Sequence, residues 1–198
     1  MSKSELIVLG ILRRKPMYGY ELMQWVEKHQ FNIWAGFNMS SMYRTLSKME
    51  EKGLVSGTQE IEGNNPPRKV YKIKQEGKKY LKSIVKETLF SDYNSHKEWW
   101  IAVSFIRKLI TKSEFLKAIK KRISELEKIY DNHDNIERKY LINGKKFDLP
   151  YYINILIDMG GEIYKTKLES LKRLEKETLS KKNNDYFIGG EDVEKTSS

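Results

Sequence analysis

Cysteine is absent from the 198 residues, which excludes disulfides, thiolate nucleophiles and cysteine-ligated zinc. Histidine is scarce: His29, His96 and His133 stand at no spacing that metal ligands use. The longest apolar run lies near residues 99–105, far short of the roughly 20 residues that a membrane span needs. The N-terminus also lacks the apolar region of a signal peptide. We therefore expect no metal, no cofactor and no membrane association, and a cytoplasmic location.

Motifs for catalysis are missing as well. Neither G-x-x-x-x-G-K-[ST] nor G-x-G-x-x-G occurs, and no histidine accompanies a nucleophile signature. The acidic pair Glu50-Glu51 consists of direct neighbours on a solvated face, which is no geometry for general acid–base work. The sequence predicts that this protein is not an enzyme.

The charge is unevenly distributed. The net charge is +10, and residues 1–90 hold 16 Lys and Arg against 9 Asp and Glu. Residues 91–180 hold 18 against 14, and the last 18 residues hold 3 against 4. A basic excess in the first half suits a polyanion partner such as nucleic acid. A generic lysine-rich surface is the alternative.

The first half has a specific order of elements. Apolar spacing predicts helices over 4–12, 19–29 and 38–52, the last closed by Gly53, with an aromatic loop at 31–37. Two short strands follow at 54–61 and 68–73, separated by the turn residues of 62–67. Three helices and then a hairpin predict a winged helix-turn-helix.

In that fold the third helix enters the major groove of DNA. Asn38 or Ser40 is expected to cap its first turn, and Arg44 to reach a guanine or a phosphate. Lys48 is better placed for a backbone phosphate, and the hairpin supplies further cations. The complete set of predicted DNA-binding residues is Tyr18, Ser40, Ser41, Tyr43, Arg44, Lys48, Arg68 and Lys69.

The second half is predicted to be helical. A linking helix spans 75–90, another carries the apolar residues from Trp99 to Ile110, and the Thr111–Glu114 capping box starts a third. A break at 143–150 separates it from a last helix over 151–179. We expect a DNA-binding domain at 1–90, a helical dimerisation and effector domain at 91–180, and a disordered tail at 181–198. The fold class is mainly α with a small β-hairpin.

Three segments carry a family resemblance. Residues 6–12 and 16–22 resemble the opening of the PadR family of transcription regulators. Residues 40–55 are similar to its recognition segment S-x-Y-R-x-L-x-x-L-E-x-x-G-L-I, and 66–77 to its wing P-x-R-x-Y-x-L-T-x-x-G. The segment 31–37 is longer and more aromatic than the family pattern, and Met39 departs from it. The resemblance implies a homodimer on an inverted-repeat operator, usually repression, and release by a small molecule or stress signal.

Dimerisation also has a physical argument. The last helix carries one apolar stripe, and a second copy would bury it. The predicted seam is Leu156, Ile163, Leu171 and Leu174, and a monomeric bundle is the alternative.

Five aromatic residues raise the question of an effector site. They are Phe31, Trp34, Tyr93, Trp99 and Trp100, which would line a pocket for a small aromatic or apolar effector. The alternative is that they are core anchors.

A winged helix that binds protein, or a helical scaffold without DNA binding, is the rival function. The polar and basic face of residues 41–48 favours double-stranded DNA over a protein partner. RNA binding is less favoured, since the strands carry no surface of stacking aromatics.

Overall fold

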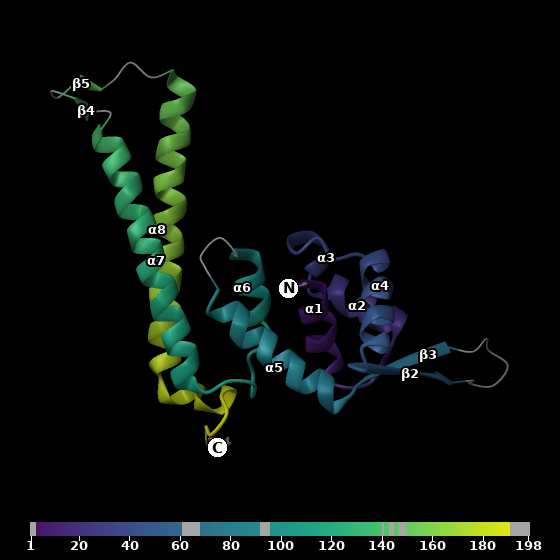
Figure 1. The fold of residues 1–198 in the computed structure, drawn as a ribbon. Coiled ribbons are helices and arrows are strands. Elements are labelled where there is room, and N and C mark those ends of the chain that lie inside the picture. The colour runs from purple at the N-terminus through teal and green to yellow at the C-terminus, as the bar shows by residue number, and fades with distance from the viewer. Residues whose placement is uncertain are drawn as a thin grey trace, which may run out of the picture. The chain divides into compact units, whose positions relative to one another are not determined.

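Helices and two small sheets make up the computed structural model, which describes residues 3–60, 68–91, 96–139, 141–142, 145–146 and 150–190 (Figure 1). They fall into two units. The first comprises Met1–Ser91 with Ser95–Leu109, and the second Asp92–Asn94 with Ile110–Ser198. The predicted fold class, mainly α with a small hairpin, is confirmed. None of the helices in the described ranges has the length and apolar character to cross a membrane.

The first unit is built around α1. The unit contains α1 (Lys3–Leu12), β1 (Met17–Tyr18), α2 (Gly19–Lys28), α3 (Phe31–Trp34), α4 (Met39–Glu51), β2 (Val55–Glu60), β3 (Arg68–Ile73), α5 (Gln75–Leu89) and α6 (His96–Val103). Residues 5–12 of α1 are all buried, because its apolar side chains point in every direction and neighbours cover each side. Helices α2, α4, α5 and α6 all contact it.

A three-stranded antiparallel sheet forms the wing, in the order β1-β3-β2. In the hairpin Val55 pairs with Ile73 and Glu60 with Arg68, and its outer end projects away from α1 and α4 (Figure 1). Strand β1 pairs Met17 with Tyr71. The sequence predicted the hairpin but not β1, because two residues are too few to show an alternating pattern.

Two other segments differ from the prediction. Residues 31–34 form the short helix α3 where a loop was expected. Helix α6 ends at Val103, although apolar spacing predicted a helix as far as Ile110. Lys108 has a φ of +53°, a left-handed conformation that no helix continues through. Leu109 and Ile110 are nevertheless buried, so their spacing reflects packing rather than helix.

The boundary between the two units also differs from the predicted domain boundary. We expected the first domain to end at residue 90, whereas the first unit extends to Leu109. The reason is that α6 packs against α1 and α5. The indole of Trp99, which is 1% exposed, donates a hydrogen bond to the Leu89 carbonyl at 3.2 Å.

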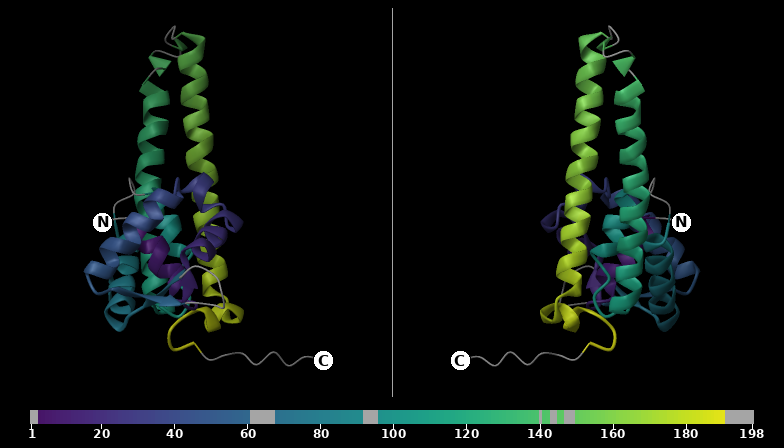
Figure 2. Two further views of the ribbon diagram at one scale, coloured as in Figure 1. Left: turned by 90° about the vertical axis from the view of Figure 1, so that its right-hand side faces the viewer. Right: turned by 90° about the vertical axis from the view of Figure 1, so that its left-hand side faces the viewer.

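The second unit is a long helical hairpin. It contains α7 (Lys112–Lys139), β4 (Leu141–Ile142), β5 (Lys145–Lys146), α8 (Tyr151–Leu179) and the 3-10 helix η1 (Lys181–Tyr186). Helices α7 and α8 lie side by side (Figure 2). The predicted capping box is present: the Glu114 carboxylate accepts from the Thr111 N–H at 2.9 Å, and the Glu114 N–H donates to the Thr111 hydroxyl at 3.2 Å. Of the predicted break, residues 143–144 and 147–149 lie outside the described part.

The segment after α8 is folded over 181–190, where we expected disorder. Phe187 is 4% exposed and its ring lies 5.9 Å from that of Phe115. The Lys112 ammonium donates to the carbonyls of Leu179 and Ser180 and to Asn184, which satisfies carbonyl groups at the end of α8. Residues 191–198 of the predicted tail lie outside the described residues.

Candidate nucleic-acid interface

Helix α4 is positioned by its two ends and its buried side. The Asn38 side chain accepts a hydrogen bond from the Ser41 N–H at 2.9 Å, which makes Asn38 rather than Ser40 the capping residue. Gly53 has a φ of +68°, where glycine costs no strain. Met42, Leu46 and Met49 are fully buried, which fixes the rotation of α4 about its axis.

That rotation places the predicted recognition residues outside. Ser40, Tyr43, Arg44 and Lys48 are exposed, and Ser41 is half-buried. Arg44 and Lys48 line a hollow of about 310 Å³ next to the N-terminal end of α1. Its other lining residues are Ser4, Glu5, Ser41, Thr45 and Lys52. The first turn of α4 and one of its sides therefore form a polar and basic surface.

An aromatic cluster joins this surface to the wing. The rings of Tyr18 and Tyr20 stack with centroids 5.6 Å apart, and the Arg68 guanidinium lies 5.8 Å from the Tyr20 centroid. The Tyr18 hydroxyl donates to Glu60 at 3.0 Å. Tyr20, which is 43% exposed, was not among the predicted site residues. The Tyr18-Gly19-Tyr20 repeat is the sequence feature that could have indicated Tyr20.

Gly19 has a steric role in this cluster. A Cβ at this position would lie 2.7 Å from the Tyr43 hydroxyl, so only glycine allows the Tyr43 ring to approach the start of α2 this closely. Tyr43 is still 45% exposed, and it extends the exposed face of α4 toward α2.

The structure gives Lys69 an internal partner. Its ammonium lies 2.7 Å from the Glu50 carboxylate, which also accepts from the Gly57 N–H at 3.1 Å. The hydrogen bond from Lys69 holds the pKa of Glu50 below its ordinary value, and the same bond raises the pKa of Lys69. Of the two predicted wing cations, Lys69 thus connects the wing to α4, whereas the exposed Arg68 lies over the Tyr20 ring.

A buried carboxylate, missed from the sequence, ties α1 to both α4 and α5. Glu5 is 8% exposed and accepts hydrogen bonds from the Lys52 ammonium at 2.9 Å and the Tyr80 hydroxyl at 2.8 Å. Burial raises the pKa of Glu5, but the hydrogen bonds more than offset it, so the pKa lies below its ordinary value. Burial and the bond to Glu5 raise the pKa of Tyr80 to about 12.

The aromatic residues of the predicted effector pocket have structural roles where they are described. Phe31 is 3% exposed, and its ring lies 5.5 Å from Trp25 and 5.8 Å from Phe105. The ring of Trp99 meets that of Trp100 edge-on at 5.1 Å. The Trp34 side chain and Tyr93 lie outside the described part. Phe31 and Trp99 fit the core-anchor interpretation that the sequence left open.

The predicted dimer seam divides into two parts. Leu156 and Ile163 are 54% and 42% exposed, but Leu171 is only 4% exposed and Leu174 is half-buried. Leu171 therefore belongs to the core of its own chain and not to a seam. Further exposed apolar residues lie on the N-terminal half of α8, namely Tyr151, Tyr152, Ile155 and Met159.

Helix α4 follows α2 after a connection that contains only the short α3, and the β2–β3 wing follows α4. The first unit is thus a winged helix-turn-helix, the class of fold that presents one helix to the DNA major groove. Residues 8–83 match the family model of the transcriptional regulator PadR-like family.

Similar proteins cover the chain to different extents. An uncharacterised protein of Lysinibacillus sphaericus is 28% identical over 81 residues, which is 41% of this chain and 73% of that protein. A PadR family transcription regulator from Clostridium difficile R20291 is 27% identical, covering 43% of this chain and 86% of its own, with a TM-score of 0.38. Bacillus subtilis PadR, solved in complex with operator DNA, is 18% identical, covering 88% of this chain and 98% of its own, with a TM-score of 0.39.

Proposed function

We propose that this PadR-like transcription regulator binds a specific double-stranded DNA site through α4 and the wing. The observation that carries the proposal is the exposed first turn and basic side of α4, held outward by the Asn38 cap and a fully buried Met42–Leu46–Met49 stripe. Arg44 can donate two parallel hydrogen bonds to a guanine edge. Lys48, one turn further on, faces a backbone phosphate, and Arg68 follows the backbone or minor groove beside the wing.

The regulator acts as a homodimer in this proposal. On the N-terminal half of α8, Tyr152, Ile155, Leu156, Met159 and Ile163 are between 42% and 59% exposed. At 3.6 residues per turn these five positions fall on one face of the helix. A second copy covers such a face with a self-complementary contact. A two-fold dimer then presents two α4 helices about one DNA turn, roughly 34 Å, apart, which requires an inverted-repeat site.

Regulation completes the proposal: bound at its operator, the dimer represses transcription, and a small molecule or stress signal releases it. Support for this part comes from the match of residues 8–83 to the model of the PadR-like family of transcriptional regulators. The proposed function is DNA binding and not catalysis.

A gel shift tests the proposal. The full-length protein is titrated onto a duplex of its own upstream region and onto a scrambled duplex, across a salt series. We expect selective retardation of the upstream duplex and a steep fall in affinity with salt, because phosphate contacts release counterions. Equal, weak binding to both duplexes, followed by failure of a genome-wide selection to enrich any site, would contradict it and favour a protein-binding winged helix.

A further inference from the structure

We propose that Met39 is a specificity-determining residue of this chain and that it contacts the C5-methyl group of a thymine in each half-site. Met39 is the first residue of α4, and its side chain is 44% exposed. The inference deepens the proposed function and rests on it, since it names the base feature that the start of α4 recognises.

Helix α4 contains three methionines, and the core takes up two of them. Met42 and Met49 are 0% exposed and belong to the stripe that fixes the rotation of the helix. That rotation leaves Met39 outside, one turn before Tyr43, which is 45% exposed. A large apolar side chain at the surface gains free energy when another apolar group covers it. Packing within the chain leaves this gain unused at Met39.

The neighbouring side chains at the start of α4 have different roles. The Asn38 side chain accepts from the Ser41 N–H at 2.9 Å, so this amide caps the helix and does not make the paired hydrogen bonds by which asparagine recognises adenine. Ser40 is exposed, but a hydroxyl group discriminates poorly between bases. Among residues 38–41, Met39 alone carries a large apolar side chain. The apolar group that bases present in the major groove is the thymine methyl.

Methionine suits such a contact. Its unbranched thioether chain has three rotatable bonds and adapts to the group that it meets. Arg44 lies five residues further on, about 7.5 Å along the helix axis, which corresponds to roughly two base-pair steps of 3.4 Å. We therefore expect the thymine within about three base pairs of the guanine that Arg44 contacts.

The surroundings of Met39 favour DNA over a protein partner. Ser40, Arg44 and Lys48 are all exposed on α4, whereas the core of a protein–protein interface is depleted of charge. Met39 is also a position at which the chain departs from the recognition segment of the PadR family. A departure at an exposed position changes the base preference without disturbing the core.

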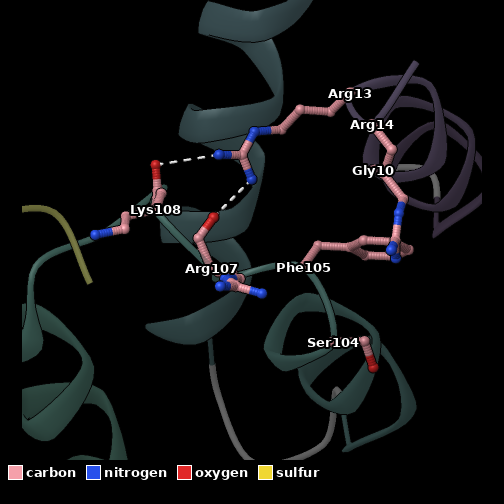
Figure 3. A pocket seen from close by; sticks show the side chains of 7 residues that line it. All are labelled: Gly10, Arg13, Arg14, Ser104, Phe105, Arg107 and Lys108. Atoms are coloured by element: carbon pink, nitrogen blue, oxygen red, sulfur yellow. Dashed lines mark hydrogen bonds between the residues drawn. The ribbon is translucent and has the colours of Figure 1, made fainter. Parts of the chain in front are cut away.

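A second cationic region of the first unit provides a control for charge. At the C-terminal end of α1, the Arg13 guanidinium donates to the carbonyls of Arg107 at 2.6 Å and Lys108 at 3.2 Å (Figure 3). Arg14 lines the same hollow, and none of the described residues that line it belongs to α4. Arg14→Gln thus removes a positive charge from the first unit and leaves the first turn of α4 unchanged.

A deoxyuridine scan of the operator, with the full-length protein, tests the assignment. Each thymine of a half-site is replaced in turn by deoxyuridine, which pairs with adenine in the same way but lacks the C5-methyl group. We expect one such replacement to weaken wild-type binding about fourfold, the effect of losing one buried methyl group. For Met39→Gln, which keeps the chain length but ends in an amide, the two duplexes should bind equally. Met39→Leu, which remains apolar, should retain the difference.

Arg14→Gln should show the wild-type ratio of the two affinities, and circular dichroism checks the folding of each variant. A wild-type ratio in Met39→Gln would overturn the inference, and loss of the ratio in Ile33→Ala instead would assign the contact to α3, where Ile33 is 75% exposed. Selective operator binding that no deoxyuridine affects would also overturn it, but would leave the proposed function standing. Absence of selective binding to any duplex would overturn both and favour a protein partner.

Discussion

Arg44 is an exposed residue near the start of α4, and it lines the hollow beside the N-terminal end of α1. We predict that Arg44→Ala weakens binding to the selected operator by about 1–3 kcal/mol and relaxes base preference at one position. The reason is that a bidentate contact to guanine is lost. Gel shifts against a set of single-base operator variants measure both effects. Unchanged affinity for every variant would remove Arg44 from base recognition.

Lys48 lies one turn further along the same face, and its substitution should have a different signature. Lys48→Ala is expected to weaken specific and scrambled duplexes about equally and to lower the slope of log K against log salt by about one, since one phosphate contact is removed. The salt series of the gel shift gives this slope. A loss confined to the operator would instead make Lys48 a base-reading residue.

The Glu5 carboxylate gives the fold a pH dependence. Its pKa is lowered in the folded state, so its contribution is present above the unfolded value of about 4.3 and is lost as pH falls. The pKa of Tyr80 is raised to about 12, so its contribution is present below about pH 10 and is lost as pH rises toward 12.

We predict that Glu5→Gln lowers the free energy of unfolding at pH 7 by about 1–3 kcal/mol, because Lys52 and Tyr80 lose a charged acceptor. It should also flatten both arms of the pH profile. Urea denaturation between pH 3 and 11 measures this, with the exposed Glu76→Gln on α5 as the control. Identical profiles for the wild type and Glu5→Gln would exclude the network as a source of stability.

At the scale of elements, α8 carries the dimerisation hypothesis. The Leu156→Glu/Ile163→Glu variant places two charges on its exposed apolar face and should yield monomers, because a dimer would bury both carboxylates without partners. Lys165→Glu changes the net charge by the same amount at an exposed position outside this face and should leave the dimer intact. Sedimentation velocity distinguishes the two. A persistent dimer in the double variant would place the seam elsewhere.

Elements that depend on local chemistry were predictable from the sequence. Helix α4 has its cap at Asn38 and its stop at Gly53, and α7 begins with the Thr111–Glu114 box. Strand β1 and the end of α6 were not predictable, because both are decided by packing: β1 exists through its pairing with β3. Phe105 likewise leaves the helix to pack on Gly10, 95 positions earlier in the sequence.

At the scale of the whole molecule, the candidate site also combines features set by local sequence with features set by long-range contacts. The exposed face of α4 followed from helical periodicity, so the exposure of Arg44 and Lys48 was predictable. The ion pair of Lys69 with Glu50 joins residues 19 positions apart, and the bond of Tyr80 to Glu5 spans 75. No local pattern indicates such contacts, which is why neither the ion pair of Lys69 nor the buried network of Glu5 was predicted.

The whole dimer determines how the two DNA half-sites must be spaced. If one two-fold axis relates both α4 helices, inserting five base pairs between the half-sites rotates one of them by about half a turn and moves it out of reach. We predict that this insertion reduces binding to the level of a duplex carrying a single half-site. A spacer of unchanged length but altered sequence serves as the control and should retain nearly full affinity, since no base of the spacer is contacted. Undiminished binding after the insertion would mean that two chains bind independently, and the exposed face of α8 would then need a partner other than a second copy.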